Sequence, residues 1–272
     1  MIVAGALLSL ALAAVEVRLE PGVARPGDVV LIEVIGSTEA PTGRLGPSEL
    51  VFLPYNGRWL ALEGLSVELK PQSRVLQVMA GDEQVDGALE IAPERFRRRQ
   101  LTVSKRFTSI SKKDQRRSKA DQRAFKAATD VDFEPWTFDA DFAWPRNAEV
   151  SAPFGDLRLF NGKKKSQHMG TDVNGETGDP IYAANDGEVT MVRDCFASGG
   201  TVLLHHGGRL FTAYFHLSAF DVKPGQRVRR GQLIGRVGSS GRVTGPHLHF
   251  GVKLDGRWVN AESLLGLDLS AP

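Results

Sequence analysis

The chain has 272 residues, a formal net charge of +2 and 42% hydrophobic residues. This length exceeds that of an average domain and predicts two domains, and the hydrophobic fraction is sufficient for a buried core. The small net charge gives no indication of a nucleic-acid partner. The single cysteine, Cys195, excludes an intramolecular disulfide and a cysteine-rich metal site.

The N-terminal segment has features of a secretory signal. Residues 2–15 form an apolar run of 14 residues, and charge begins at Glu16. This run is too short to cross a bilayer as a helix, but it suits a signal peptide, and the Ala-Leu-Ala sequence ending at Ala13 fits a cleavage site. Because no Lys or Arg precedes the run, a buried first strand or helix is the alternative. We predict a signal peptide over residues 1–14, export to a periplasm or cell wall, and no stable membrane span after cleavage.

Residues 15–93 are predicted to form a small β-sandwich-like domain. Short runs such as "DVVLIEVIG" and "SRVLQVMAG" are separated by Pro-Gly, Asn-Gly and Gly-Asp pairs. Strands at this spacing are typical of a β-sandwich. The segment contains no histidine and no titratable cluster, so we interpret it as a structural or targeting module.

Residues 94–135 are predicted to be a basic linker that contains a helix. Thirteen Lys or Arg and three Asp or Glu lie within residues 94–126. Ser111 and Asp114 bound a capping-box sequence that could open a helix toward Ala128. Because this helix is polar nearly all round, we expect it to be solvated. Contact with an anionic partner, such as a wall polymer or lipid headgroups, is the functional alternative.

Residues 136–272 predict a second, antiparallel β-domain, which makes the chain predominantly all-β. Short apolar runs such as "GTVLLHH" and "RLFTAYFH" alternate with glycine-containing turns. All six histidines lie here, between residues 168 and 249. Structural histidines would not usually cluster in this way, so a shared site is a reasonable hypothesis.

Two short motifs place metal-binding side chains at suitable spacings. His168 and Asp172 are four residues apart, and Gly170 between them favours a strand or tight loop over a regular helix. In a strand, His247 and His249 point to the same face. Each motif alone is weak, but together they can supply a His, an Asp and a further His, with a fourth position open to water as in catalytic zinc sites. Such donors suit zinc or another first-row divalent ion.

The remaining histidines are less informative. Tyr214 and His216 share a face if their strand is regular. His205 and His206 are adjacent and therefore face opposite sides of a strand end next to a Gly-Gly turn. At most one of the two could face a site, and we interpret both as structural or surface residues.

Several segments between residues 153 and 265 resemble, in order and spacing, the lysostaphin-type zinc metallopeptidases that cut peptidoglycan cross-links. They are "FGDLR", "HMGTD", "GDPIYAANDGEV", "YFHLS", "VRRGQLIGRVGSSGRVTGPHLHFGV" and "NAESLL". Together they are far more specific than any one motif. The resemblance implies an antiparallel β metallopeptidase domain with a narrow groove over the metal. The N-terminal module and the basic linker lie outside the resemblance.

The resemblance also implies roles for five side chains. The family's H-x-x-x-D motif falls on His168 and Asp172, and the last histidine of its H-x-H motif falls on His249, which makes these three the implied zinc ligands. The first histidine of H-x-H, His247, and the histidine of the Tyr-x-His segment, His216, are the implied non-ligand catalytic histidines. None of these residues is missing, whereas inactive regulatory relatives lack ligands.

The expected chemistry agrees with this allocation. The sequence has no H-E-x-x-H motif, so no glutamate base stands in the usual metalloprotease place. Of His216 and His247, one could accept a proton from the attacking water while the other, protonated, stabilises the developing charge. Sequence does not decide which does which. Arg158 of "FGDLR" is either a groove residue that meets substrate carboxylates or a surface arginine.

These observations predict an exported zinc endopeptidase that acts on the peptide stems of peptidoglycan. The expected bond is a DD-cross-link between D-alanine and a diamino acid, with a glycine bridge as second choice. The alternative from another class is a non-catalytic peptidoglycan-binding activator of a separate cell-wall hydrolase. A further possibility is that residues 94–126 plug the groove. The sequence gives no oligomeric state.

Overall fold

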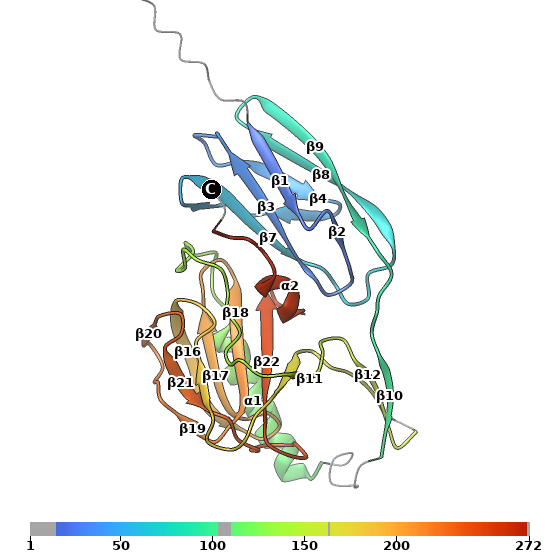
Figure 1. The fold of residues 1–272 in the computed structure, drawn as a ribbon, viewed down its shortest axis with the longest axis vertical. Coiled ribbons are helices and arrows are strands. Elements are labelled where there is room, and N and C mark those ends of the chain that lie inside the picture. The colour runs from blue at the N-terminus through green and yellow to red at the C-terminus, as the bar shows by residue number, and fades with distance from the viewer. Residues whose placement is uncertain (1–14, 103–109, 163, 271–272) are drawn as a thin grey trace, which may run out of the picture.

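The structure, a computed structural model, describes residues 15–102, 110–162 and 164–270 (Figure 1). Strands make up most of the regular structure in both halves, so the predicted all-β fold class is confirmed. The predicted signal peptide, residues 1–14, lies outside the described residues. In the part of the chain that the structure describes, no helix is long and apolar enough to cross a bilayer.

The N-terminal domain consists of two sheets that pack around a common apolar core. Strand alternation provides that core: in β8, Leu76, Val78 and Ala80 are buried, whereas Gln77 and Met79 are exposed. The strand orders are β1-β3-β7-β6 and β2-β9-β8-β4-β5. The strands are β1 (Glu16–Glu20), β2 (Val23–Ala24), β3 (Val29–Ile35), β4 (Thr42–Leu45), β5 (Ser48–Leu50), β6 (Leu53–Tyr55), β7 (Arg58–Gly64), β8 (Gln72–Ala80) and β9 (Glu83–Ile91).

The two domains share a second hydrophobic core. Val29 and Leu31 of β3 belong to the same buried cluster as Val259 and Leu264 near the C-terminus. The backbone N–H of Val29 also donates to Ser263 Oγ at 2.9 Å. The domains are therefore packed on each other and are not joined by the linker alone. The boundaries expected at residues 93 and 135 stay predictions.

The C-terminal domain is built on an antiparallel sheet of eight strands in the order β11-β14-β22-β18-β17-β16-β20, with β23 paired to β22. One face packs into the shared core through side chains such as Leu204, Tyr214 and Phe250. The opposite face carries Phe215 and His249. The strands are β11 (Val150–Ala152), β14 (Thr171–Asn174), β16 (Gly187–Cys195), β17 (Gly199–His205), β18 (Leu210–Leu217), β20 (Arg227–Val228), β22 (His247–Leu254) and β23 (Arg257–Val259).

Smaller elements complete this domain. A sheet with the order β15-β21-β19 lies beside the large one (Figure 1). A short helix follows β23 and is capped by Asn260, whose side chain accepts from the backbone N–H of Glu262. These elements are β15 (Pro180–Tyr182), β19 (Ala219–Phe220), β21 (Leu233–Arg236) and α2 (Ala261–Leu265).

The basic linker begins with a strand that sequence patterning did not predict. Strand β10 (Arg98–Leu101) pairs in parallel with β12 (Leu157–Phe160), which in turn pairs with β13 (Lys164–Gln167). Two linker arginines, Arg97 and Arg99, hold this strand to the buried carboxylate of Asp156, with N···O distances of 3.0 and 3.2 Å. The first part of the linker is thus integrated into the C-terminal domain.

The predicted helix is present as α1 (Lys112–Ala128) and begins at the predicted cap, Ser111, whose Oγ accepts from the backbone N–H of Asp114 at 3.1 Å. The expectation that α1 is solvated all round is wrong. Asp121 is buried and accepts from Arg193 Nε at 2.8 Å. The ring of Phe125 stacks on Phe215, with centroids 6.5 Å apart. Helix α1 therefore covers part of the sheet face that carries His249.

Candidate metal centre

Two adjacent strands and one turn bring His168, Asp172 and His249 together. Strands β14 and β22 are antiparallel, and their register places Asp172 directly opposite His249. Side chains directly opposite each other in such a pair are neighbours on one face. His168 lies in the short loop between β13 and β14, in agreement with the strand or tight loop that Gly170 predicts.

Gly170 is required for this close approach. A Cβ atom at Gly170 would lie 2.6 Å from His249 Nε2 and 2.8 Å from the carbonyl oxygen of Phe250. Any larger residue would therefore push His249 out of place. Sequence reasoning used Gly170 only against a helix and missed this contact.

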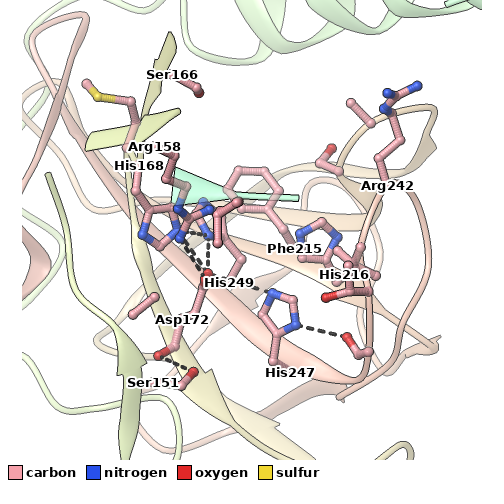
Figure 2. Close-up of a pocket in the computed structure, with 18 of the residues that line it drawn as sticks. Ser151, Arg158, Ser166, His168, Asp172, Phe215, His216, Arg242, His247 and His249 are labelled. Carbon is pink, nitrogen blue, oxygen red and sulfur yellow. Dashed lines mark hydrogen bonds and ion pairs between the residues drawn. The ribbon is translucent and has the colours of Figure 1, made fainter. Parts of the chain in front are cut away.

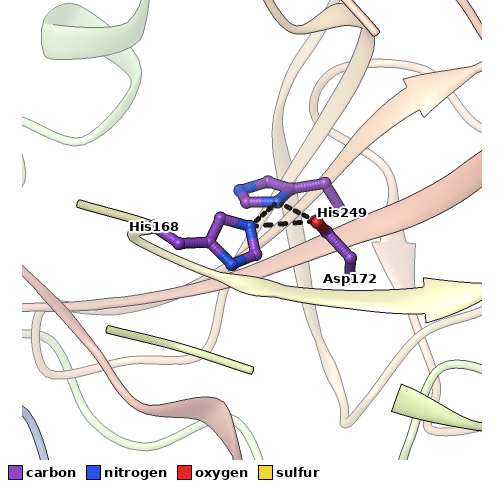
Figure 3. Close-up of side chains that lie close together, drawn as sticks. All are labelled: His168, Asp172 and His249. Atoms are coloured by element: carbon purple, nitrogen blue, oxygen red, sulfur yellow. Dashed lines mark hydrogen bonds and ion pairs between the residues drawn. The ribbon is translucent and has the colours of Figure 1, made fainter. Parts of the chain in front are cut away.

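The three predicted donor atoms converge on one point (Figure 3). His168 Nε2 lies 3.0 Å from Asp172 Oδ1 and 3.0 Å from His249 Nδ1, and His249 Nδ1 lies 2.7 Å from the same oxygen. Donors of a tetrahedral zinc site are roughly 3.3 Å apart, given metal–ligand bonds of about 2.0–2.2 Å. The separations of 3.0, 3.0 and 2.7 Å are thus shorter than that value by roughly 0.3–0.6 Å, so a small outward movement of the side chains would give that arrangement.

The proton positions favour a cation between these atoms. His168 Nδ1 lies 2.9 Å from the carbonyl oxygen of Pro153, which can only accept, so Nδ1 carries the hydrogen and Nε2 of a neutral ring carries a lone pair. That lone pair faces Asp172 Oδ1, another acceptor. One hydrogen on His249 Nδ1 could not satisfy all three contacts, whereas a metal ion could. Fixing the ligand tautomer through a backbone carbonyl is common in metal sites.

The second carboxylate oxygen of Asp172 faces away from this point. Asp172 Oδ2 accepts from Arg158 Nη2 at 3.3 Å, and both side chains are mostly buried. Burial opposes the ionisation of Asp172, but the contacts with His168 and His249 hold the pKa of its carboxyl well below the usual range. Arg158 therefore lies in the cavity, where it orients Asp172.

His216 and His247 stand next to the three donor atoms. Their ring centroids are 5.1 Å apart, and His247 Nε2 lies 3.7 Å from Asp172 Oδ1. Backbone carbonyls orient both rings: His216 Nδ1 lies 3.0 Å from Ser240 O, and His247 Nδ1 lies 3.0 Å from Gly245 O. Burial, together with the neighbouring His249 and His247, lowers the pKa of His216 to about 3.

Strand alternation predicts one of these positions correctly and the other wrongly. His247 and His249 share the cavity face, as predicted. Tyr214 and His216 do not share a face: Tyr214 is buried in the core, where its hydroxyl accepts from the backbone N–H of Ala184. A φ of 65° at His216 breaks the alternation and turns its side chain into the cavity beside Phe215.

His205 and His206 do not line the cavity, which confirms their structural interpretation. His206 is fully buried, with Nδ1 2.6 Å from Asp186 O and Nε2 2.8 Å from Thr212 Oγ1. His205 stacks on Phe211, with ring centroids 4.7 Å apart.

The five predicted site residues line an open cavity of about 940 Å³ (Figure 2). Part of its lining comes from the linker, through Arg99, Leu101 and Thr102. Another part comes from the segment before β22, through residues such as Arg242. A groove plug formed by residues 94–126 was a possibility from the sequence, but no pattern pointed to these three residues, because the pairing of β10 with β12 joins segments that are far apart in the chain.

An antiparallel β-domain with a His-Asp-His trio at the base of an open cavity defines a metallopeptidase-like class of protein. Residues 166–261 match the family model "Peptidase family M23". The chain therefore contains a domain of this lysostaphin-type family, as the sequence motifs predicted.

Curated relatives match a little under half of the chain. "Peptidoglycan DD-endopeptidase ShyA" of Vibrio cholerae is 42% identical over 125 residues, which is 46% of this chain and 28% of the relative. "DD-carboxypeptidase/endopeptidase Mpg" of Neisseria meningitidis is 41% identical over 115 residues, which is 42% of this chain and 26% of the relative. The matched segment thus spans only about a quarter of the length of these relatives.

One solved structure resembles nearly the whole chain. A crystal structure of a Pseudomonas aeruginosa protein described as peptidase M23 is 27% identical, has a TM-score of 0.67, and covers 89% of this chain and 94% of its own. The similarity therefore extends beyond the family domain into the N-terminal half.

Proposed function

We propose that the protein is an exported zinc-dependent endopeptidase that hydrolyses peptide cross-links of bacterial peptidoglycan. The observation that carries this proposal is the convergence of three donor atoms, with two further imidazoles, on one point of an open cavity. The names of the curated relatives support the same substrate class. Action on peptidoglycan in turn supports export, for which the apolar N-terminus is the sequence signal.

His168, Asp172 and His249 would hold the metal ion. Their two nitrogens and one oxygen form a donor set that zinc and similar divalent ions accept. When bound, zinc supplies Lewis-acid polarisation of the scissile carbonyl and activation of a water molecule. Arg158 keeps the Asp172 carboxylate turned so that Oδ1 faces the other two donors.

Hydrolysis of an amide also requires two proton movements. The attacking water must lose a proton, and the leaving amine must gain one. His216 and His247 are the imidazoles beside the donor trio, and their rings are held by backbone carbonyls. One imidazole can take the proton from the water and the other can give a proton to the amine nitrogen as the C–N bond breaks.

We infer that the bond cut is the DD-cross-link between D-alanine and a diamino acid. The names of the relatives, which refer to DD-endopeptidases, favour this bond over a glycine bridge. The cavity lining extends beyond the donor trio, because residues from β10, β13 and the segment before β22 all contribute to it.

Metal removal and restoration test this function. The full chain is stripped with a chelator, divided, and reloaded with either one equivalent of zinc or buffer alone. Both samples are incubated with purified peptidoglycan, and the released fragments are identified by mass spectrometry. We expect cross-linked dimers to become monomers only in the zinc sample. Stoichiometric zinc binding with no cleavage would instead favour a non-catalytic peptidoglycan-binding activator.

A further inference from the structure

Three arginines line the cavity, and only two of them have an acidic partner among the described residues. Arg99 Nε lies 3.2 Å from Asp156 Oδ2, and Arg158 Nη2 lies 3.3 Å from Asp172 Oδ2. The guanidinium of Arg242 instead lies over the ring of Phe196, 5.5 Å from its centroid. This contact leaves its N–H donors available for an anion, because cation–π packing uses the flat face of the group.

The backbone around Arg242 is fixed by several hydrogen bonds. The N–H of Arg242 donates to Ala197 O at 2.9 Å. Ser240 Oγ accepts from the N–H of Gly200 and donates to Leu217 O, both at 2.8 Å. Such anchoring lowers the cost of ordering Arg242 when a ligand binds.

Gly241 makes this anchoring possible. It has a φ of 80°, and a Cβ atom there would lie 2.4 Å from the backbone nitrogen of Gly199. The segment that carries Arg242 is therefore packed tightly against the loop before β17.

Arg242 lies on the His216 side of the cavity and across from His168 and Arg158 (Figure 2). The His216 ring is tied to Ser240, two residues before Arg242. In the proposed hydrolysis, the leaving amine must receive a proton from His216 or His247. The amine half of the substrate therefore lies on this side, and groups attached next to the scissile nitrogen come closest to Arg242.

We propose that Arg242 is a specificity-determining residue that binds a free carboxylate on the carbon bearing the scissile nitrogen. This inference rests on the proposed endopeptidase function. A diaminopimelate cross-link carries such a carboxylate, whereas the amine of a lysine side chain or of a glycine bridge does not. Arg242 thus makes the cavity selective for diaminopimelate-type cross-links. A planar guanidinium can hold a carboxylate through two parallel hydrogen bonds.

Two synthetic substrates test the proposal with the zinc-loaded full chain. Both contain D-alanine joined to diaminopimelate, and they differ only in whether the carboxyl group beside the scissile nitrogen is free or a carboxamide. The wild type should cleave the free carboxylate with a kcat/KM that is higher by roughly 10- to 100-fold, the range for a charge-assisted hydrogen bond. The Arg242→Gln variant should cleave both at the wild-type rate for the carboxamide. Arg242→Lys should retain part of the preference.

Arg229→Gln is the matched control, because Arg229 is exposed and lies outside the cavity lining. It should keep the wild-type preference. Equal losses on both substrates in Arg242→Gln, or equal cleavage of both by the wild type, would overturn the proposal while leaving the endopeptidase function intact. If the zinc-loaded wild type cleaves neither substrate nor purified peptidoglycan, the proposed function itself fails.

Discussion

The two faces of the eight-stranded sheet differ in character, although the same strands build both. On the core face, Leu204, Leu248 and Phe250 are fully buried among other apolar side chains. On the cavity face, Asp172 and His249 meet at 2.7 Å. One alternation of strand residues thus supplies the stability of the domain on one side and its polar cluster on the other.

Two histidines show what this difference means chemically. His206, on the core side, has one fixed partner for each ring nitrogen, Asp186 O and Thr212 Oγ1. His249 Nδ1, on the cavity side, is crowded by both Asp172 Oδ1 and His168 Nε2. A buried histidine with separate partners is satisfied by the protein, whereas several lone pairs directed at one point need a cation. The arrangement of acceptors, and not burial, separates a structural histidine from a candidate ligand.

Replacing one histidine on each face of the sheet should give the largest difference in zinc content and in peptidoglycan hydrolysis. His249→Ala removes one of three donors, so we expect zinc to be lost and peptidoglycan hydrolysis to be abolished. His206→Gln changes a histidine that does not line the cavity and should keep both properties, provided that circular dichroism shows a folded protein. Zinc per chain is measured by elemental analysis and hydrolysis by fragment release. Undiminished hydrolysis by His249→Ala would refute the proposed metal centre.

The histidines on the cavity face should differ in role: some bind the metal and others transfer protons. His216→Ala is expected to lower kcat by roughly 10²- to 10⁴-fold, the usual contribution of a positioned acid or base, while zinc binding stays stoichiometric. The same assay on His247→Ala gives a second value. Loss of zinc together with activity in either variant would make that histidine a ligand and contradict the assignment.

The core side should respond to pH through His206. Burial, its largest influence, lowers the pKa of His206 to about 4 from the ordinary value of 6.5. The unfolded chain therefore takes up a proton below pH 6.5 while the folded protein does not. The contribution of His206 to the free energy of unfolding is fully present above pH 6.5. It decreases as the pH falls toward 4, by up to about 3 kcal/mol.

Urea unfolding of the wild type and of His206→Gln at pH 7 and pH 4.5 isolates this contribution. The variant is less stable at pH 7 because it loses hydrogen bonds, but its free energy of unfolding should fall less on acidification. Parallel losses in the two proteins would show that His206 is not the titrating group.

Local sequence patterns predicted the site residues correctly where the backbone is regular. They failed where the backbone departs from regular strand geometry. The alternation at His247 and His249 and the cap at Ser111 were readable from sequence because each depends on residues close in the chain. The orientation of His216 could not be predicted in this way, because a positive φ at this residue turns its side chain to the face opposite to the one that strand alternation predicts.

Long-range pairing explains the other failures. Strand β10 pairs with β12, which lies more than fifty residues later in the chain, so no local sequence pattern predicts that Arg99 lines the cavity. Helix α1 packs mainly through Phe125 and a few alanines, which is too little apolar surface to stand out in a basic sequence. The contact between Arg158 and Asp172 likewise depends on the tertiary fold, and it indicates a positioning role that is neither of the two alternatives drawn from the sequence, a substrate contact or a surface arginine.

Removing the positioning contact of Arg158 should have the smallest effect of the changes considered, a loss of zinc affinity. Arg158→Gln removes the charge that holds Asp172 Oδ2, so the carboxylate loses its fixed orientation toward His168 and His249. Supporting contacts of this kind typically contribute 10- to 100-fold in metal affinity, and we expect zinc affinity to fall within that range. Competition with a chelator of known affinity measures the change.

Arg99→Gln is the matched control, because Arg99 pairs with Asp156 and not with Asp172. It should leave zinc affinity unchanged, whereas Arg158→Lys should recover part of the loss by restoring the charge. If Arg158→Gln bound zinc as tightly as the wild type while its hydrolysis of peptidoglycan fell, Arg158 would act on the substrate and not through Asp172. The cavity face would then contain two substrate-binding arginines in place of one.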